Sequence, residues 1–282
     1  MCGSGSELRS PDGSSSTAYR GHTDDDLRAL GVVPGDVLLV HSSVQSLGFV
    51  AGGVQAVVEA LLSAVGPEGT LVVPTHTSEN TDPAGWQDPP VPEQWWPVIR
   101  SETPGFDPAR TPSRWVGVLS EVVRTWPGAL RSGHPQVSCA ALGARAREVT
   151  VEHDLAESHG ERSPIGAVYR LGGRVLLLGC GHDSNTSLHL AERRQAAPPM
   201  GETGAAISDA DGTSRWVTWT DLMTGEEDFD RLGAAFEETG AVTLGQVGSA
   251  AARLMDQRSL VDFAVDWMSR NRCEVDVDAA GS

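Results

Sequence analysis

The 282-residue chain carries 21 basic and 38 acidic side chains, which leaves a formal net charge of −17. This charge excludes a protein that coats nucleic acid, because such proteins neutralise phosphates with a surplus of basic side chains. All the basic residues are arginines, and the sequence contains no lysine. An acidic surface attracts cations and also keeps a protein soluble. The charge favours solubility as its main role and leaves a polycationic ligand open.

No apolar run approaches the roughly 18–20 residues that a membrane helix needs, and the first residues lack the apolar core of a signal peptide. We therefore expect a soluble, cytoplasmic protein with no membrane or nucleic-acid partner. The cysteines are scattered and form no CxxC pair, so we expect free thiols and neither disulfides nor a structural zinc site. These cysteines are Cys2, Cys139, Cys180 and Cys273.

One folded domain is expected over residues 21–272. The preceding residues 1–20 are rich in Gly, Ser and Pro and are predicted to form a disordered tail. Residues 273–282 are expected to form a C-terminal tail.

The first predicted elements form a parallel crossover unit. A helix begins at Thr23, where a capping threonine precedes three aspartates, and ends at Gly31. The apolar run over residues 37–41 predicts a buried strand, and residues 54–65 and 70–74 predict a helix and a second strand. A strand, a helix and a strand with short connections indicate a right-handed crossover between parallel strands.

A segment rich in proline and tryptophan follows over residues 78–112. Its prolines, including Pro89 and Pro90, exclude regular structure throughout, and long irregular segments in compact domains are usually functional. We expect this segment to form a wall of a binding site. Helical periodicity returns over residues 113–126.

The remaining elements complete one α/β domain. Strands are expected over residues 137–142, 175–178 and 216–219, and helices over residues 144–157, from Ser163, and over residues 229–239 and 259–270. The fold class that fits this order is a single domain with a central mixed, largely parallel β-sheet flanked by helices.

The segment richest in reactive groups, residues 180–192, follows an apolar strand. In open α/β sheets, ligands bind at the carboxyl ends of such strands. Thr186 or Ser187 can cap a helix here, and His189 and Glu192, three residues apart, then share one face. A carboxylate beside an imidazole fixes its tautomer and makes it a better proton acceptor.

Five stretches of the sequence share the pattern of a known family: HSSVQSLGFVAGG (41–53), GTLVVPTHT (69–77), FDPARTPSRWVGVLSEVVRTWPGALRSGHPQVSCAALG (106–143), GERSPIG (160–166) and NTSLHLAE (185–192). Together they resemble the aminoglycoside 3-N-acetyltransferase family, from about residue 23 to residue 270. The resemblance implies acetyl transfer from acetyl-CoA to the 3-amino group of a 2-deoxystreptamine ring, and with it aminoglycoside resistance. It also implies an α/β fold unrelated to the GNAT acetyltransferases, whose Q/RxxGxG/A loop is absent here.

The resemblance gives the base role to His189 and makes Glu192 its orienting carboxylate. His189 would deprotonate the 3-amine, which would then attack the acetyl group directly in a ternary complex without an acyl-enzyme. The alternative is that Glu192 pairs with Arg193 or Arg194 and that His189 is a packed helix residue.

For acetyl-CoA, the resemblance implies contacts at three places that lie near strand ends or turns. Phosphate would bind at the N-terminus of a helix starting at Ser113, between two arginines, and a hydroxyl or N–H near Ser42 or Thr75 would stabilise the oxyanion. Turn formation, capping and surface ion pairs are the alternatives. The expected cofactor-binding residues are His41, Ser42, Ser43, Val44, Thr75, Thr77, Arg110, Thr111, Ser113 and Arg114.

The acceptor site is expected to be acidic, because an aminoglycoside carries several ammonium groups. Glu161, Asp183 and the cluster of Glu226, Glu227 and Asp228 are the candidates. His134 lies in the family's SxHP pattern, and structural packing is its expected role. We expect no metal and a monomer or homodimer.

Three other functions are weighed against this one. A metal-dependent amidohydrolase or peptidase would use His182, Asp183, His189 and Glu192, but their spacing does not match HExxH. A non-catalytic protein that sequesters polycations would need neither a base nor a cofactor loop. The same acyl transfer to a different small amine remains open.

Overall fold

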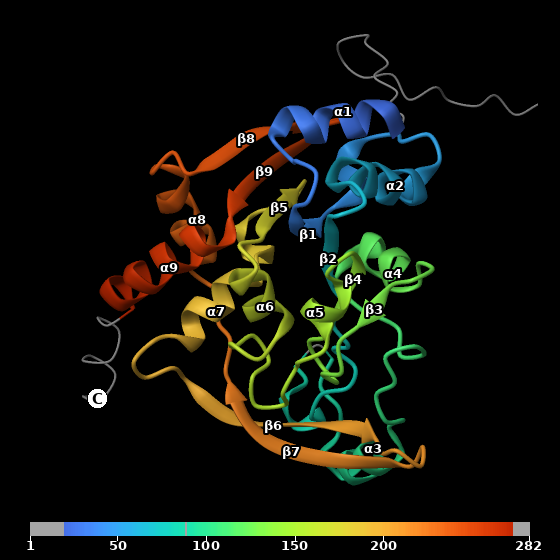
Figure 1. Ribbon diagram of the computed structural model, residues 1–282. Coiled ribbons are helices and arrows are strands. Elements are labelled where there is room, and N and C mark those ends of the chain that lie inside the picture. The colour runs from blue at the N-terminus through green and yellow to red at the C-terminus, as the bar shows by residue number, and fades with distance from the viewer. Residues whose placement is uncertain (1–19, 88, 273–282) are drawn as a thin grey trace, which may run out of the picture.

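A seven-stranded mixed sheet forms the centre of the computed structural model, which describes residues 20–87 and 89–272 (Figure 1). Its strands are β1 (Val37–Ser42), β2 (Thr70–Pro74), β3 (Leu130–Arg131), β4 (Cys139–Gly143), β5 (Arg174–Leu178), β8 (Val242–Val247) and β9 (Ala250–Asp256). They lie in the order β3-β4-β2-β1-β5-β9-β8. The central strands β2, β1 and β5 are parallel and the flanking pairs are antiparallel. The expected mixed sheet flanked by helices is confirmed, and its parallel part is the centre.

Helices cover both faces of this sheet. One face packs against α1 (Arg20–Leu30), α2 (Gly53–Val65) and α4 (Gly117–Arg124). The other packs against α5 (Ala146–Thr150), α6 (Pro164–Arg170), α7 (Ser187–Arg193), α8 (Phe229–Glu237) and α9 (Gln257–Asn271).

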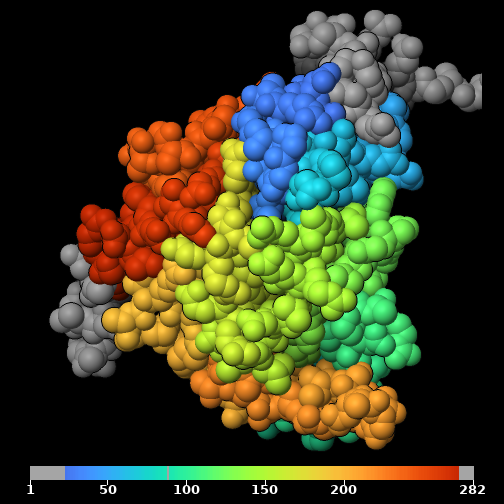
Figure 2. All heavy atoms as spheres, in the orientation of Figure 1, coloured from blue at the N-terminus to red at the C-terminus, as the bar shows by residue number. Residues whose placement is uncertain are grey.

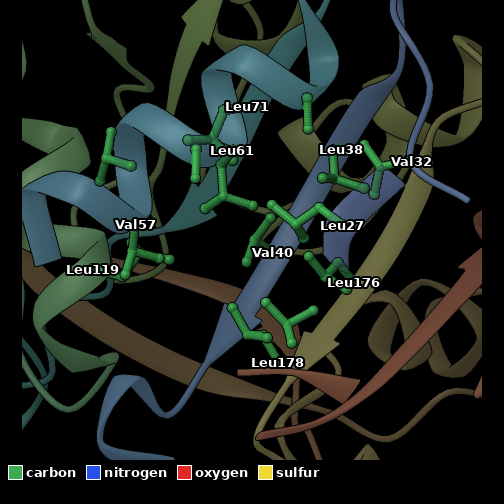
Figure 3. Close-up of a cluster of buried hydrophobic side chains, with 14 of the residues drawn as sticks. Leu27, Val32, Leu38, Val40, Val57, Leu61, Leu71, Leu119, Leu176 and Leu178 are labelled. Atoms are coloured by element: carbon green, nitrogen blue, oxygen red, sulfur yellow. The ribbon is translucent and has the colours of Figure 1, made fainter. Parts of the chain in front are cut away.

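The central strands are apolar on both sides because both sides are covered. Side chains of a strand alternate between its two faces. Leu38 and Val40 of β1 therefore join the first apolar cluster, with Leu61 of α2 beside them in Figure 3, while Val37 and Leu39 join the second. This double burial explains why continuous apolar runs, rather than alternating ones, mark these strands.

A separate two-stranded hairpin, β6 (Met200–Ser208) and β7 (Ser214–Leu222), runs along the lower edge of the molecule in Figures 1 and 2. The irregular segment that contains η2 (Pro83–Gly85), η3 (Glu93–Trp95) and α3 (Trp96–Glu102) packs against it. Asn80 joins the two, since its amide donates to the Ala206 carbonyl and accepts from the Ala206 N–H, both at 2.8 Å. Gly105 is required beside this contact, because a Cβ there would lie 2.4 Å from the Ile207 carbonyl oxygen.

The helix predicted to start at Ser113 begins only at Gly117. The N–H and hydroxyl of Ser113 both donate to the Glu121 carboxylate, at 3.0 and 2.7 Å. Trp115 has a φ of 64°, a left-handed conformation that a right-handed helix cannot include. Residues 113–116 therefore form a turn, and the predicted helix start is wrong.

Other element predictions differ at their ends. The helix expected over residues 144–157 is only α5, because the chain then turns back and the Asp154 N–H donates to the Arg162 carbonyl. The first helix begins at Arg20 instead of Thr23. Strands β3, β6, β8 and β9 were not predicted.

The predicted tails at residues 1–20 and 273–282, with Cys2 and Cys273, lie outside the described residues except for Arg20. Cys139 and Cys180 are free thiols, as expected. Among the helices of residues 20–87 and 89–272, none combines the length and the apolar character needed to cross a bilayer.

Replacing Leu61 with Ala tests the first apolar cluster. Leu61 is fully buried, so Leu61→Ala should lower the free energy of unfolding by about 2–5 kcal/mol through lost burial and an internal cavity. The matched control is Leu244→Ala on the edge strand β8, where the side chain is 60 % exposed and the change should stay within about 0.5 kcal/mol. Urea titrations of both variants measure the difference, and equal losses would contradict this account of the core.

Candidate active site

The candidate site lies where the parallel strands β1 and β5 end. The chain after β1 leads to α2 on one face of the sheet, and the chain after β5 leads to α7 on the other. Such a reversal is the usual ligand position in an open α/β sheet. β1 pairs with β2 only as far as Leu39 but with β5 as far as Ser42, so the ends of β1 and β2 separate.

A cavity of about 320 Å³ occupies this position. The end of β1, the end of β2, the turn before α4, the segment after β5 and the loop before α8 all contribute to its wall. Its lining residues are His41, Ser42, Pro74, His76, Trp115, Val116, Gly117, Cys180, Asp183, Ser184, Thr186, His189 and Glu226.

His189 and Glu192 form a buried pair on α7. The Nδ1 atom of His189 lies 2.6 Å from Oε2 of Glu192, and the two side chains are 6 % and 1 % exposed. The shared helix face predicted from their spacing is confirmed. Because a carboxylate accepts, Nδ1 carries the proton in the neutral ring, and Nε2 is left with a free lone pair. His189 lines the cavity, so this arrangement can accept a proton from a ligand.

Glu192 does not pair with its sequence neighbours. Its second oxygen accepts from Nη1 of Arg272 at 2.6 Å and from the N–H of Gly225 at 3.3 Å. Arg193 instead pairs with Glu157, and Arg194 with Glu161. The alternative in which Glu192 binds Arg193 or Arg194 is therefore wrong.

Further histidines surround the pair. The His159 ring lies 4.7 Å from the His189 ring, centre to centre, and 6.0 Å from that of His76. Burial lowers the pKa of His41 to about 3 and that of His76 to about 4, with a further contribution from neighbouring histidines. Burial also holds the pKa of His159 well below its usual range. These rings are neutral at pH 7, so they add no positive charge to the cavity.

A second cavity of about 570 Å³ lies beside the first. The chain after β2 and the turn before α4 contribute to the walls of both cavities. Thr77, Arg110, Thr111 and Arg114 line the second cavity, together with residues of the β6–β7 turn. The Arg114 N–H donates to the His76 carbonyl at 2.8 Å, which joins a wall residue of the second cavity to one of the first. The proline-rich segment thus contributes a wall of a cavity.

Both arginines of the second cavity already have carboxylate partners. Arg110 pairs with Asp107 at 2.7 Å, and Arg114 pairs with Glu79 at 2.8 Å. Their side chains remain 84 % and 52 % exposed, so both guanidinium groups stay accessible to an anionic ligand. The helix N-terminus expected at Ser113 is wrong, because Ser113 binds Glu121 and the helix begins four residues later. Phosphate binding beside the two arginines stays a prediction.

Several predicted cofactor residues are used within the fold. Thr75 is completely buried: its N–H donates to the Ser138 carbonyl, and its hydroxyl contacts Ser138 and accepts from Arg131. The Thr77 hydroxyl donates to the Pro135 carbonyl. Neither threonine hydroxyl is free to bind an oxyanion.

The end of β1 and the loop that follows it differ in whether they line a cavity. His41 and Ser42 line the first cavity, and His41 Nε2 lies 3.3 Å from the Thr186 hydroxyl. Ser43 and Val44 line neither of these two cavities: the Ser43 N–H donates to the Leu178 carbonyl, and Val44 begins the short η1 (Val44–Leu47).

Of the predicted acceptor-binding carboxylates, Asp183 and Glu226 line the first cavity. Oε1 of Glu226 lies 4.0 Å from Nε2 of His189. Glu161 lines neither cavity and pairs with Arg194, and Asp228 pairs with Arg272. The structure thus brings two of these carboxylates to the cavity that His189 lines, and one of them, Glu226, beside the candidate base.

The sequence of the chain matches one family over most of its length. Residues 39–269 match the family described as aminoglycoside 3-N-acetyltransferase. The chain belongs to this family. Its members are acyltransferases, so the resemblance stated from the sequence motifs is confirmed.

Two relatives illustrate the match. The SPbeta prophage-derived aminoglycoside N(3')-acetyltransferase-like protein YokD of Bacillus subtilis (strain 168) is 41 % identical over 248 residues, which cover 88 % of this chain and 91 % of YokD. Aminoglycoside N(3)-acetyltransferase VII of Streptomyces paromomycinus is 35 % identical over 269 residues, which cover 86 % of this chain and 88 % of the relative.

Solved structures of family members share the fold. The crystal structure of YokD from Bacillus subtilis superposes with a TM-score of 0.90 at 38 % identity, covering 93 % of this chain and 97 % of YokD. The binary complex of AAC-IIIb with CoASH gives 0.81 at 33 % identity, covering 90 % and 97 %. AAC-VIa bound to sisomicin gives 0.78 at 29 % identity, covering 89 % and 97 %.

The family's SxHP histidine, His134, has a structural role here. It is completely buried, its Nδ1 accepts from the N–H groups of Gln136 and Val137, and its Nε2–H donates to the Leu155 carbonyl. These bonds require the neutral ring and connect the turn before β4 to the loop after α5. The prediction that His134 packs rather than reacts is supported.

The metal-hydrolase alternative gains no support. Nε2 of His182 lies 3.2 Å from Oε1 of Glu237, and the His182 ring packs closely against Gly233 of α8. Over residues 20–87 and 89–272, no three His, Cys, Asp or Glu side chains converge as metal ligands would.

Sequence reasoning missed His159 and Arg272. His159 directly precedes the GERSPIG motif, and this position was the one available signal. Arg272 is 80 residues from Glu192 in the chain, so no local spacing points to it.

His134 should make the fold sensitive to acid. Burial lowers its pKa to about 4 from about 6.5 in the unfolded chain, so the unfolded state binds the extra proton first and stability falls as the pH drops from about 6.5 towards 4. Between pH 7 and pH 5, the free energy of unfolding of His134→Gln should fall by about 1–2 kcal/mol less than that of the natural protein. Denaturant titrations at both pH values measure this, and identical pH dependence would contradict the assignment.

Proposed function

We propose that the protein transfers the acetyl group of acetyl-CoA to the 3-amino group of the 2-deoxystreptamine ring of an aminoglycoside, directly and within a ternary complex. The observation that carries the proposal is the buried His189–Glu192 pair on a cavity that Glu226 and Asp183 also line. An imidazole held in one tautomer supplies the base, and two nearby carboxylates suit a cationic acceptor. The family membership of the chain supports the same reaction.

The reaction begins with a proton transfer, because an ammonium has no lone pair with which to attack. Nε2 of His189 accepts one proton from the 3-ammonium group, while Glu192 stabilises the imidazolium that forms. The freed lone pair forms a C–N bond with the thioester carbonyl carbon, which gives a tetrahedral oxyanion. The C–S bond then breaks and CoA leaves. The 3-ammonium nitrogen loses two protons in the whole reaction. One of them ends on the CoA sulfur and the other is released to solvent.

Acetyl-CoA would bind across the two cavities. Arg110 and Arg114 in the larger cavity suit the phosphates, and the adjoining smaller cavity suits the thioester, beside His189. A relative, AAC-IIIb, is known in a complex with CoASH. Since acetyl-CoA is a cytoplasmic metabolite, the proposal places the enzyme in the cytoplasm.

The acceptor would approach past Glu226 and Asp183. The net charge of −17 favours the encounter with a polycation, and the neutral histidines of the cavity do not repel it. AAC-VIa, another family member, is known bound to sisomicin. Acetylation of the 3-amine would lower the charge of the antibiotic and confer resistance.

Release of free thiol from acetyl-CoA tests the function. Gentamicin and neomycin, which carry a 3-amine, should give turnover, and compounds whose 3-amine is absent or blocked should give none. Expression in a susceptible bacterium should raise the inhibitory concentration of the same drugs. Turnover with unrelated small amines but with no aminoglycoside would transfer the proposal to another acceptor, and binding of the drugs without thiol release would indicate sequestration.

His189→Ala tests the base. The variant should lose about 10²–10⁴-fold in turnover, the range of a positioned general base, while it binds CoA nearly as tightly as before. Thiol release and isothermal titration with CoA measure the two effects. Arg194 directly follows the same helix and pairs with Glu161 outside the cavity, so Arg194→Gln serves as the control, with turnover near that of the natural protein. Near-normal turnover of His189→Ala would refute the base assignment.

A further inference from the structure

Glu192 is the most heavily bonded carboxylate of the active site. It is 1 % exposed and accepts from three donors on three segments of chain: His189 on its own helix, the Gly225 N–H before α8 and Arg272 after α9. Removing one partner of such a buried charge is strongly destabilising unless another group compensates. Each of these donors therefore helps to hold Glu192 in place, and Glu192 in turn holds His189.

Arg272 binds both Glu192 and the loop that carries Glu226. Its Nε and Nη2 donate to the two oxygens of Asp228 at 2.9 and 2.5 Å, while Nη1 donates to Glu192 at 2.6 Å. Nη2 also lies 3.4 Å from the Gly225 carbonyl. Because the Gly225 N–H is bound by Glu192, both peptide groups of the residue before Glu226 are fixed by this network.

Arg272 remains charged in this position. Partial burial disfavours the charged guanidinium, but hydrogen bonds to Asp228 and Glu192 outweigh it and raise the pKa of Arg272 above its usual range. Its planar fork binds two carboxylates at once, which a lysine ammonium does not do with the same geometry. Arg272 is thus a permanent positive charge that is connected to the candidate base through two hydrogen bonds, both made by Glu192.

The groups that face His189 show why the positive charge of Arg272 matters. Glu192 contacts it from α7, Glu226 from the loop before α8, and three neutral histidines surround it: His41 in β1, His76 after β2 and His159 in the loop before α6. Phe229 of α8 packs against its ring without charge. Farther out, Asp183 lines the same cavity and Asp228 binds Arg272. Arg272 is the one cation bonded to this set among the described residues.

We propose that Arg272 is a positioning residue of the acetyl transfer, which keeps Glu192 ionised and aimed at Nδ1 of His189 so that the imidazole stays neutral until it meets the acceptor. The same guanidinium holds Glu226 at the cavity. Without it, the buried pair carries an unbalanced negative charge and takes up a proton at higher pH. A base that is already protonated cannot accept the proton of the substrate. The inference rests on the proposed function, in which His189 is the base.

The test is the pH profile of kcat/KM for acetyl-CoA and gentamicin. Arg272→Gln should move the acid limb of the profile to higher pH by about one unit, about tenfold in rate on that limb, and should raise the KM for the aminoglycoside more than that for acetyl-CoA. Arg272→Lys keeps the positive charge, so the acid limb of its profile should lie close to that of the natural protein. Arg270→Gln, an exposed position on the last turn of α9, is the matched control and should leave the profile unchanged.

A second measurement does not depend on turnover. The imidazole resonance that disappears in His189→Gln can be titrated by NMR in the free enzyme, with and without Arg272→Gln. The midpoint should move to higher pH by a similar amount, and CoA binding by isothermal titration should confirm that the variant is folded. An unmoved midpoint together with an unmoved acid limb, in a folded variant, would overturn the proposal. If no aminoglycoside supports turnover, the proposed function fails, while the NMR titration still decides the role of Arg272.

Discussion

A buried carboxylate needs hydrogen-bond donors or a cation at both of its oxygens, and Glu192 is the buried carboxylate of the candidate active site. Its oxygens connect α7 to the loop before α8 and to the end of α9. Three segments distant in sequence are therefore fixed around one side chain. Glu192 is bonded to His189, to Arg272 and to the residue before Glu226, so structure and chemistry are constrained by the same group.

The sheet provides the space in which this group acts. β1 leaves β2 after Leu39 but stays with β5 to Ser42, and the cavity lies where these strands diverge. Helices on both faces bury most of β1, β2 and β5, which makes the ends of these strands a rigid frame for the loops that follow. Binding residues therefore lie on short loops that are anchored at one end by a buried strand.

Burial also sets the charge of the cavity. It lowers the pKa of His41 and His76 far enough that both are neutral at pH 7, whereas Glu226 is 63 % exposed and retains contact with water. The cavity is negative as a result, although histidines supply much of its wall. Such a site is compatible with the polycationic acceptor, the neutral base and the anionic cofactor of the proposed reaction.

The sequence by itself determined the elements that depend on local or fully buried patterns. The runs at β1, β2 and β5 are mostly apolar because both sides of each strand are covered, and helical spacing alone places His189 and Glu192 on one helix face. The tertiary structure decided what depends on contacts between distant segments. It buried Thr75 against Ser138, moved the start of α4 past Ser113, formed the half-exposed strands β6 and β8, and brought Arg272 to Glu192 across 80 residues. Spacing along the chain carries no information about such contacts, because they arise only when packing brings the two segments together.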